Sequence, residues 1–179
     1  TSGWNSSAYS ERPGSAIAMT LILRPAIPIF QLAQIALLGG LAVLEGIEQV
    51  TRLTAKLKWP NDVLIGGKKV AGVLAEAAFT GHKLESVVLG IGVNVNAGPP
   101  PDLKLEYPAS CLAVEAGQQF DREVVITAVL SAFDARYPQL GTAMVARAWA
   151  KHLAMIGKNI IAIGPTETII GRLEGVTEA

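Results

Sequence analysis

The densest polar chemistry of the chain lies in residues 58–76, which read KWPNDVLIGGKKVAGVLAE. Lys69 is the residue of this stretch most suited to chemistry. Because side chains alternate on a strand, Lys69 is predicted to share a face with three apolar residues, Ala71, Val73 and Ala75. A lysine on a buried face is costly unless an anion meets it, so Lys69 is a candidate anion-binding residue. The alternative is that Lys69 lies near the strand end, where its amine reaches water.

A turn and a hairpin are predicted to position Lys69. Pro60 fixes its own φ and biases Trp59 towards an extended conformation. Asn61 and Asp62 can hydrogen-bond to their own backbone, so this block is predicted to be a turn. Two apolar runs follow, separated by Gly-Gly, which is typical of a β-hairpin with a two-residue turn. The pattern places Lys69 near the start of the second hairpin strand.

A further strand is predicted from Leu84 to Val95, and its two faces differ. One face is continuously apolar and should carry the helices. The other face contains Gly90, Gly92 and Asn94. Two glycines on one face would leave a trough where a ligand approaches the backbone, with the Asn94 amide at its end. The alternative is that the glycines mark a bulge or tight curvature.

The N-terminal half also predicts a strand and a long helix. Residues 15–24 are apolar on both faces and are predicted to form a buried strand. A helix is expected over about residues 28–50. Residues 25–44 carry no charge and are long enough to span a bilayer. Two glutamines, two prolines and an apolar stripe at helical spacing favour a buried helix of a soluble protein instead.

The C-terminal half predicts three helices and two strands. Ser110 is expected to cap a short helix that Gly117 ends, and Asp121 to cap the next helix. A third helix is predicted over residues 141–152. From residue 157 the sequence becomes β-branched and predicts two strands, which are marginal without a third.

Composition narrows the classes of protein to which the chain belongs. Its 179 residues include 15 basic and 15 acidic ones, a balance that argues against a broad nucleic-acid surface. The single cysteine, Cys111, excludes an internal disulfide and suits a reducing cytoplasm. We expect its side chain to pack in the core and not to act as a nucleophile. His82 lies in a polar turn and is expected to be solvated. Residues 1–11 are polar and show no signal peptide.

The block Lys58-Trp59-Pro60-Asn61-Asp62, followed after a hairpin turn by KKVAGVLAE, resembles the signature of the biotin protein ligases. The spacing Gly-x-Gly-x-Asn in the later strand is similar to the same family. The resemblance covers about residues 13–179. It implies an α+β fold like that of class II synthetases, with a mixed, mainly antiparallel sheet and helices packed on one face. It also implies a catalytic domain over residues 1–155 and, over 156–179, the beginning of a small SH3-like β-barrel domain.

The resemblance implies an ATP-dependent ligase. Such an enzyme activates biotin as biotinyl-5'-AMP and transfers it to a lysine of a biotin carboxyl-carrier protein. ATP and Mg²⁺ are the implied cofactors, biotin is the substrate, and the carrier domain of a carboxylase is the partner. Members of this family often form homodimers by sheet extension, so the resemblance implies a homodimer as one expected assembly. No membrane or nucleic-acid partner is expected, because a repressor role needs a DNA-binding domain and none fits before Pro13.

The resemblance also assigns roles to the residues that contact biotin. Lys69 would contact the biotin carboxylate and later the adenylate, as the catalytic residue. Gly72 would let the backbone reach biotin. Gly90, Gly92 and Asn94 would form the trough that receives the ligand.

Nucleotide binding is assigned to the turn before the hairpin. Lys58, Trp59, Asn61 and Asp62 match positions near the nucleotide, and Asn94 would contribute from the neighbouring strand. Asp62 would supply the hard oxygen that Mg²⁺ prefers. Trp59 would otherwise serve only in packing.

One segment departs from the family pattern. A glycine- and arginine-rich loop normally folds over the adenylate, whereas residues 1–12 here hold a single arginine and no Gly-x-Gly. The sequence is therefore that of a fragment, of an unusual or inactive member, or of a chain that lacks its mobile segments. The alternative function is a truncated, catalytically weak or inactive relative that binds biotin. A lipoate or octanoyl transferase is a third hypothesis, against which the KWPND block argues.

Overall fold

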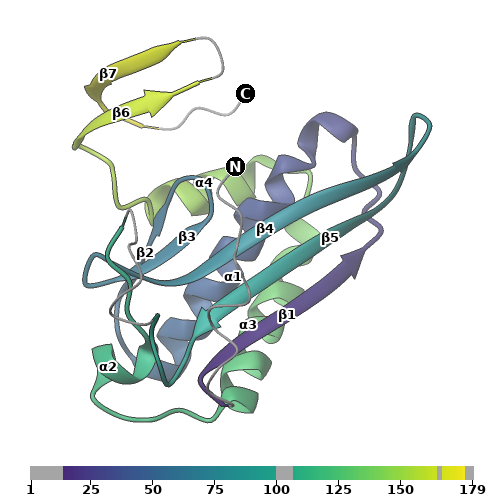
Figure 1. Ribbon diagram of the computed structural model, residues 1–179. Helices are drawn as coiled ribbons and strands as arrows, with labels where there is room; N and C mark the ends of the chain where they lie inside the picture. Colours follow the sequence, from purple (N-terminus) through teal and green to yellow (C-terminus); the bar gives the residue numbers. More distant parts are fainter. Residues whose placement is uncertain (1–13, 100–106, 165–166, 176–179) are drawn as a thin grey trace.

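The computed structural model describes residues 14–99, 107–164 and 167–175 (Figure 1). The segment over residues 1–12 and its departure from the family loop lie outside the described residues. A five-stranded antiparallel sheet organises the described part, with strand order β1-β5-β4-β3-β2. Its strands are β1 (Ala16–Leu23), β2 (Ala55–Lys58), β3 (Asp62–Ile65), β4 (Lys68–Thr80) and β5 (Lys83–Asn94). The mainly antiparallel sheet predicted from the sequence is confirmed.

The glycine hairpin lies where the sequence predicts it. Gly66 and Gly67 join β3 to β4 and have φ values of +57° and +78°. Both values fall in the left-handed region, which a two-residue hairpin turn of the primed type requires and which glycine adopts at little cost. The turn over residues 59–61 joins β2 to β3, as the Pro-Asn-Asp pattern indicates.

The helices cover one face of the sheet (Figure 1). They are α1 (Ala33–Thr51), α2 (Leu112–Ala116), α3 (Arg122–Arg136) and α4 (Ala143–Lys151), with 3-10 turns at η2 (Ile29–Gln31) and η3 (Tyr137–Gln139). Asp121 caps α3 as predicted, because its Oδ1 accepts a hydrogen bond from the Glu123 amide at 2.8 Å. Ser110 does not cap α2. Cys111 occupies that position, and the Ser110 hydroxyl is used elsewhere.

The core lies between the sheet and α1. On β5 the apolar face predicted to carry the helices is buried, from Val87 to Val95. Two glycines of α1 allow close packing. A Cβ at Gly39 would lie 2.9 Å from the Val73 side chain, and one at Gly46 would lie 2.7 Å from the Val129 backbone of α3. The helix therefore packs closely against both β4 and α3.

Residues 29–51 are also long and apolar enough to cross a membrane. In the fold, 50% of the most apolar window of this segment is buried. Leu38, Leu41, Leu44 and Ile47 are each at most 1% exposed. Packing of α1 in the core of the domain accounts for the apolar composition of this segment.

Strand β1 corrects one expectation. It was expected to be buried on both faces, but Ile17 is its one fully buried residue and Ile22 is 64% exposed. The reason is its position, because β1 is an edge strand and only one of its faces meets the helices.

The two predicted C-terminal strands are present as β6 (Asn159–Ile163) and β7 (Thr168–Arg172), which pair antiparallel. They form a separate two-stranded sheet to one side of the main one (Figure 1). Most of their apolar residues are exposed, including Ile163 at 82% and Ile170 at 74%. The SH3-like barrel and the domain boundary between residues 155 and 156 stay predictions.

Candidate active site

One cross-strand row of the sheet brings four of the nine predicted site residues together. Read across the five strands, the row consists of Lys58, Asp62, Gly72, Gly92 and Ala18. Directly paired residues of antiparallel strands point to the same face. This row lies on the face away from α1, which we call the outer face, because the neighbouring β5 residues face the helices. A charged pair therefore adjoins a part of the sheet that has no side chains.

Lys69 reaches the outer face because β4 contains a bulge. The register of β3 and β4 shifts between Val63 and Leu64, and Val70 is the extra residue. One extra residue reverses the alternation of side chains beyond it. The prediction that Lys69 shares a face with the apolar residues after it on β4 is therefore wrong. Its Nζ lies instead 2.5 Å from Oδ1 of Asp62.

Asp62 lies between two ammonium groups. Lys69 approaches its Oδ1, and the Nζ of Lys58 lies 3.5 Å from its Oδ2. The Asp62 side chain is 9% exposed, so the carboxylate is stabilised by these cations and not by bulk water. The Lys58 Nζ also lies 4.9 Å from the ring centroid of Tyr107. Two cations and one anion leave the cluster with a surplus positive charge, which favours an incoming anion.

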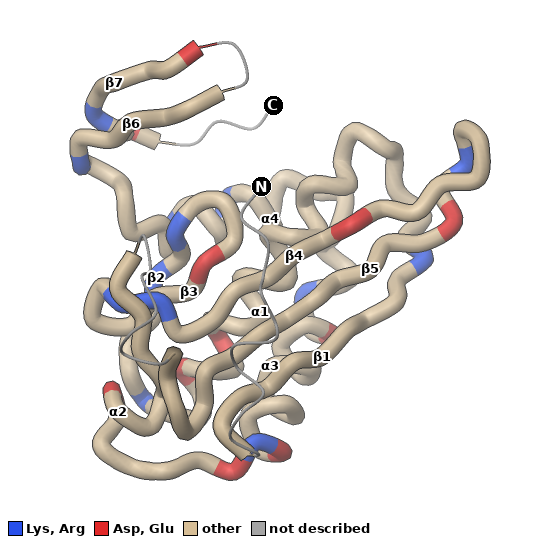
Figure 2. Tube along the Cα trace, in the orientation of Figure 1, with Lys and Arg blue, Asp and Glu red and all other residues tan. Residues whose placement is uncertain are grey.

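Figure 2 shows where charged residues lie along the whole sheet. Basic and acidic positions gather around β2, β3 and the start of β4, whereas the middle of β5 carries neither. Other charged positions lie along β4 and at the far end of β4 and β5, so the uncharged middle of β5 separates the charges near the Lys-Trp-Pro-Asn-Asp turn from those at the opposite end.

Gly90 and Gly92 do not mark a bulge. β5 keeps an unbroken register with β1 from Val87 to Asn94, and both glycines pair in regular order with β4. The bulge alternative is therefore wrong for these two glycines. A Cβ at Gly90 would meet no atom closer than 3.7 Å, so the fold does not force this residue to be glycine. Close approach of a ligand to the two glycines stays a prediction.

Asn94 has a structural partner. Its side chain is buried, and Nδ2 donates a hydrogen bond to the Ser110 carbonyl at 2.9 Å. One of its two N–H donors is thus used to hold the segment before α2. The second N–H and the carbonyl oxygen are the groups that could serve a ligand, as the sequence predicts.

The turn before β3 holds the two remaining predicted residues. The Asn61 carbonyl accepts a hydrogen bond from the Val73 amide at 2.9 Å, which ties the turn to β4. Trp59 is 62% exposed, and its ring meets Trp149 of α4 edge-on, with ring centroids 5.9 Å apart. Part of the Trp59 ring is therefore packed against Trp149, and most of its surface remains accessible.

Sequence reasoning missed four residues around the site. Tyr107 and Trp149 contact Lys58 and Trp59 from distant parts of the chain, and no local pattern signals such contacts. Ser110 has a local signal, which predicts a helix cap, whereas Glu115 lies within the predicted helix and has no signal of its own. They form instead a side-chain pair beside Lys69.

A metal site is not preassembled in the described part of the chain, which contains no group of three or more His, Cys, Asp or Glu side chains around one point. Asp62 is the one carboxylate of the cross-strand row. Mg²⁺ bound to a nucleotide takes one or two protein carboxylates and draws its other ligands from phosphates and water. A single carboxylate fits only this binding of Mg²⁺ together with a nucleotide. Asp62 would have to give up its contact with Lys58 or Lys69 to bind the ion.

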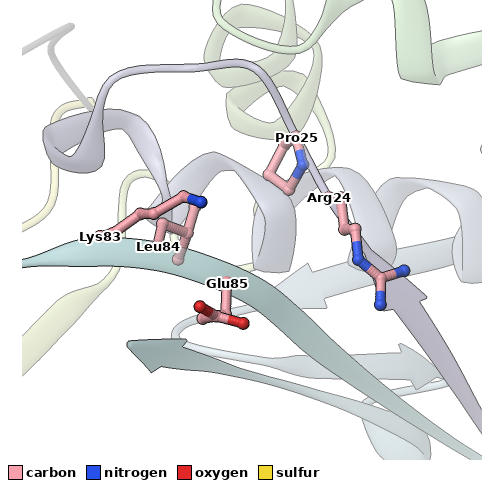
Figure 3. A pocket seen from close by; sticks show the side chains of 5 residues that line it. All are labelled: Arg24, Pro25, Lys83, Leu84 and Glu85. Atoms are coloured by element: carbon pink, nitrogen blue, oxygen red, sulfur yellow. The ribbon is translucent and has the colours of Figure 1, made fainter. Parts of the chain in front are cut away.

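A cavity of about 380 Å³ lies away from this site (Figure 3). It is lined by Arg24, Pro25, Lys83, Leu84 and Glu85. These residues lie where β1 ends and β5 begins, at the opposite end of both strands from Asn94. The cavity contains no residue of the predicted site.

Solved structures of similar fold are biotin protein ligases. The apo structure of the enzyme from Aquifex aeolicus matches with a TM-score of 0.80 and 28% sequence identity, over 92% of this chain and 72% of that one. The structure of the same enzyme in complex with biotin and ATP matches with a TM-score of 0.77, over 92% of this chain and 68% of that one. The fold is therefore that of this class of ligases.

A sequence model of the Biotin/lipoate A/B protein ligase family matches residues 5–94. Biotin--[acetyl-CoA-carboxylase] ligase of Paracoccus denitrificans is 34% identical over 175 residues, which are 93% of this chain and 72% of that protein. The chain belongs to this family, and within it to the biotin protein ligases. The bifunctional ligase/repressor BirA of Bacillus subtilis is 36% identical over 98% of this chain. The chain spans 55% of the length of that relative.

Proposed function

We propose that the chain carries the catalytic part of a biotin protein ligase. In the first step the biotin carboxylate attacks the α-phosphorus of ATP, which forms biotinyl-5'-AMP and releases pyrophosphate. In the second step a lysine amine of a biotin carboxyl-carrier protein attacks the acyl carbon, which forms the amide and releases AMP. The ligase names of the relatives support the proposal, as does the complex of the Aquifex enzyme with biotin and ATP.

The observation that carries the proposal is the position of Lys69. Its amine lies on the outer face, in contact with Asp62 and beside the Gly72–Gly92 pair. The first step must bring together two anions, a carboxylate and a phosphate, which repel each other. A fixed ammonium group beside backbone free of side chains is well suited to hold both. We assign Lys69 to the biotin carboxylate and the adenylate. We assign Gly72, Gly90 and Gly92 to close approach of the ligand to the protein backbone.

Nucleotide binding is assigned to the adjoining turn. Lys58, Asn61 and the second N–H of Asn94 would contact the phosphates and the nucleoside, and the exposed face of Trp59 would contact its base. Asp62 would hold Mg²⁺ once Lys69 pairs with a substrate anion. The ion would neutralise phosphate charge. The expected compartment is the cytoplasm, and a homodimer stays a prediction.

The test is biotin-dependent release of pyrophosphate from ATP. We expect Lys69→Ala to lower kcat/KM about 100-fold or more, because the charge that holds both anions is lost. Lys83→Ala is the matched control. Lys83 is an exposed lysine of the same sheet at the far end of β5, and its loss should leave the rate unchanged.

Three results would contradict the proposal. Equal losses in the two variants would show that Lys69 has no special role. Biotin binding without pyrophosphate release in the wild-type protein would favour the alternative of an inactive biotin-binding relative. Turnover with lipoate in place of biotin would move the chain to the other branch of its family.

A further inference from the structure

We propose that Ser110 is a positioning residue for Lys69 and Asn94, and that Glu115 holds its side chain in place. The inference rests on the proposed contact between Lys69 and biotin. Neither Ser110 nor Glu115 belongs to the cross-strand row, and neither is placed in contact with substrate. Their role follows from what surrounds Lys69.

Lys69 needs support from outside the β3–β4 hairpin. The bulge at Val70 lies directly after it, and a bulge disrupts the regular ladder of hydrogen bonds with the neighbouring strand. The segment over residues 108–110 supplies that support. The Lys69 amide donates to the Pro108 carbonyl at 2.8 Å, and the Ser110 amide donates to the Lys69 carbonyl at 2.9 Å. Both backbone hydrogen-bonding groups of Lys69 are thus bound to this one segment.

Ser110 also binds Asn94. Its carbonyl accepts the hydrogen bond from Asn94 Nδ2, at 2.9 Å. A single buried serine, 8% exposed, therefore contacts the backbone of one proposed ligand-binding residue and the side chain of another. A shift of Ser110 would move both residues together.

The Ser110 side chain is held in turn by Glu115 of α2. The Ser110 hydroxyl donates to Glu115 Oε1 at 2.5 Å, and the Nζ of Lys68 lies 3.0 Å from the same oxygen. Lys68 directly precedes Lys69, so the contacts close a ring that runs from Lys69 through Ser110 and Glu115 back to β4. A hydrogen bond to a carboxylate is stronger than one between neutral groups, so this ring fixes the segment firmly.

The experiment measures biotin binding by calorimetry in the full chain. We expect Ser110→Ala to weaken binding about tenfold, because small displacements of a binding group are costly. Ser110→Thr keeps the hydroxyl and should restore binding to within about twofold. Glu115→Ala removes the acceptor of the Ser110 hydroxyl and should weaken biotin binding by the same factor as Ser110→Ala. It also carries the test if Ser110→Ala does not fold, as judged by its thermal unfolding midpoint.

A double-mutant cycle separates positioning from a general loss of structure. If Ser110 acts through Lys69 and Asn94, then Ser110→Ala should weaken binding by a smaller factor in the Lys69→Ala background than in the wild type, because only its effect on Asn94 remains. A general destabilisation would weaken binding by the same factor in both backgrounds. Val114→Ala is the matched control, since Val114 lies beside Glu115 on α2, is 68% exposed and makes none of these contacts.

The outcomes are distinct. Unchanged binding in Ser110→Ala, or equal factors in the two backgrounds, overturns the inference while leaving the proposed function intact. Absence of biotin binding by the wild-type chain overturns both proposals. A loss that Thr rescues and that is smaller in the Lys69→Ala background supports positioning.

Discussion

At the scale of single residues, the site is defined by how its charges are matched. Asp62 is nearly buried and contacts both Lys58 and Lys69. A buried carboxylate without partners would be costly, and two ammonium groups held close together would repel each other. The three side chains therefore stabilise one another before any ligand arrives. An incoming anion can replace Asp62 as the partner of Lys69 without exposing an unpaired charge.

The stability of the fold around the site depends on pH through Glu115. The Ser110 hydroxyl, and after it Lys68, lowers the pKa of this carboxyl below its usual value of 4.5. A carboxyl group whose pKa is lower in the folded state than in the unfolded state stabilises the fold above about pH 4.5. That stabilisation is lost as the pH falls through the folded-state pKa.

We therefore expect Glu115→Gln to lower the free energy of unfolding by about 1 kcal/mol at pH 7. The deficit relative to wild type should shrink as the pH falls below 4.5. Urea unfolding at pH 7 and at pH 3.5 measures both quantities. Glu123→Gln, on the exposed first turn of α3, is the control. A deficit that stays constant across this range would contradict the assignment of the pKa.

At the scale of elements, the bulge in β4 is the feature that decides the chemistry. Without an extra residue at Val70, Lys69 would face α1 and could not approach Asp62 or the glycine pair. The segment over residues 108–110 compensates for the broken ladder by pairing with Lys69. Strand β4, its bulge and the segment over residues 108–110 together hold the Lys69 amine on the outer face.

Close packing of α1 against its neighbours also operates at this scale. A Cβ at Gly46 would lie 2.7 Å from a backbone nitrogen of α3, which cannot move aside as a flexible side chain can. We expect Gly46→Ala to destabilise the protein by about 2–3 kcal/mol, although alanine is the better helix former.

The measurement is urea unfolding of Gly46→Ala beside Gly171→Ala. A Cβ at Gly171 of β7 would meet no atom within 4 Å, so this second substitution should leave stability nearly unchanged. Equal stability of Gly46→Ala and wild type would show that α1 and α3 are less closely packed than described.

At the scale of the whole molecule, stability resides in the main sheet and its helices. Ile47 of α1 is fully buried there, whereas Ile163 of β6 is 82% exposed. We expect Ile47→Ala to cost about 2–5 kcal/mol and Ile163→Ala less than about 0.5 kcal/mol. The two substitutions delete the same atoms, so any difference reports on burial. Similar losses in denaturant unfolding would show that β6 and β7 are covered in solution.

Much of this architecture could be predicted from the sequence, because the relevant signals are local. Gly66-Gly67 predicted the hairpin, the apolar stripe of α1 predicted a buried helix, and Asp121 predicted a helix start. Each of these depends on backbone geometry or periodicity within a few residues. The Lys-Trp-Pro-Asn-Asp block likewise pointed to the family that the comparisons show.

Tertiary structure alone decided where the charges lie. Strict alternation placed Lys69 on the wrong face, because a one-residue bulge depends on how β3 and β4 pair and leaves no mark in the sequence. The contacts of Ser110 with Asn94 and of Tyr107 with Lys58 join residues far apart in the chain. Local sequence thus determined which elements form and which residues could do chemistry. The pairing of the strands and the packing of distant segments against them determined which of those residues meet. Side-chain contact depends on strand register and not on spacing in the sequence.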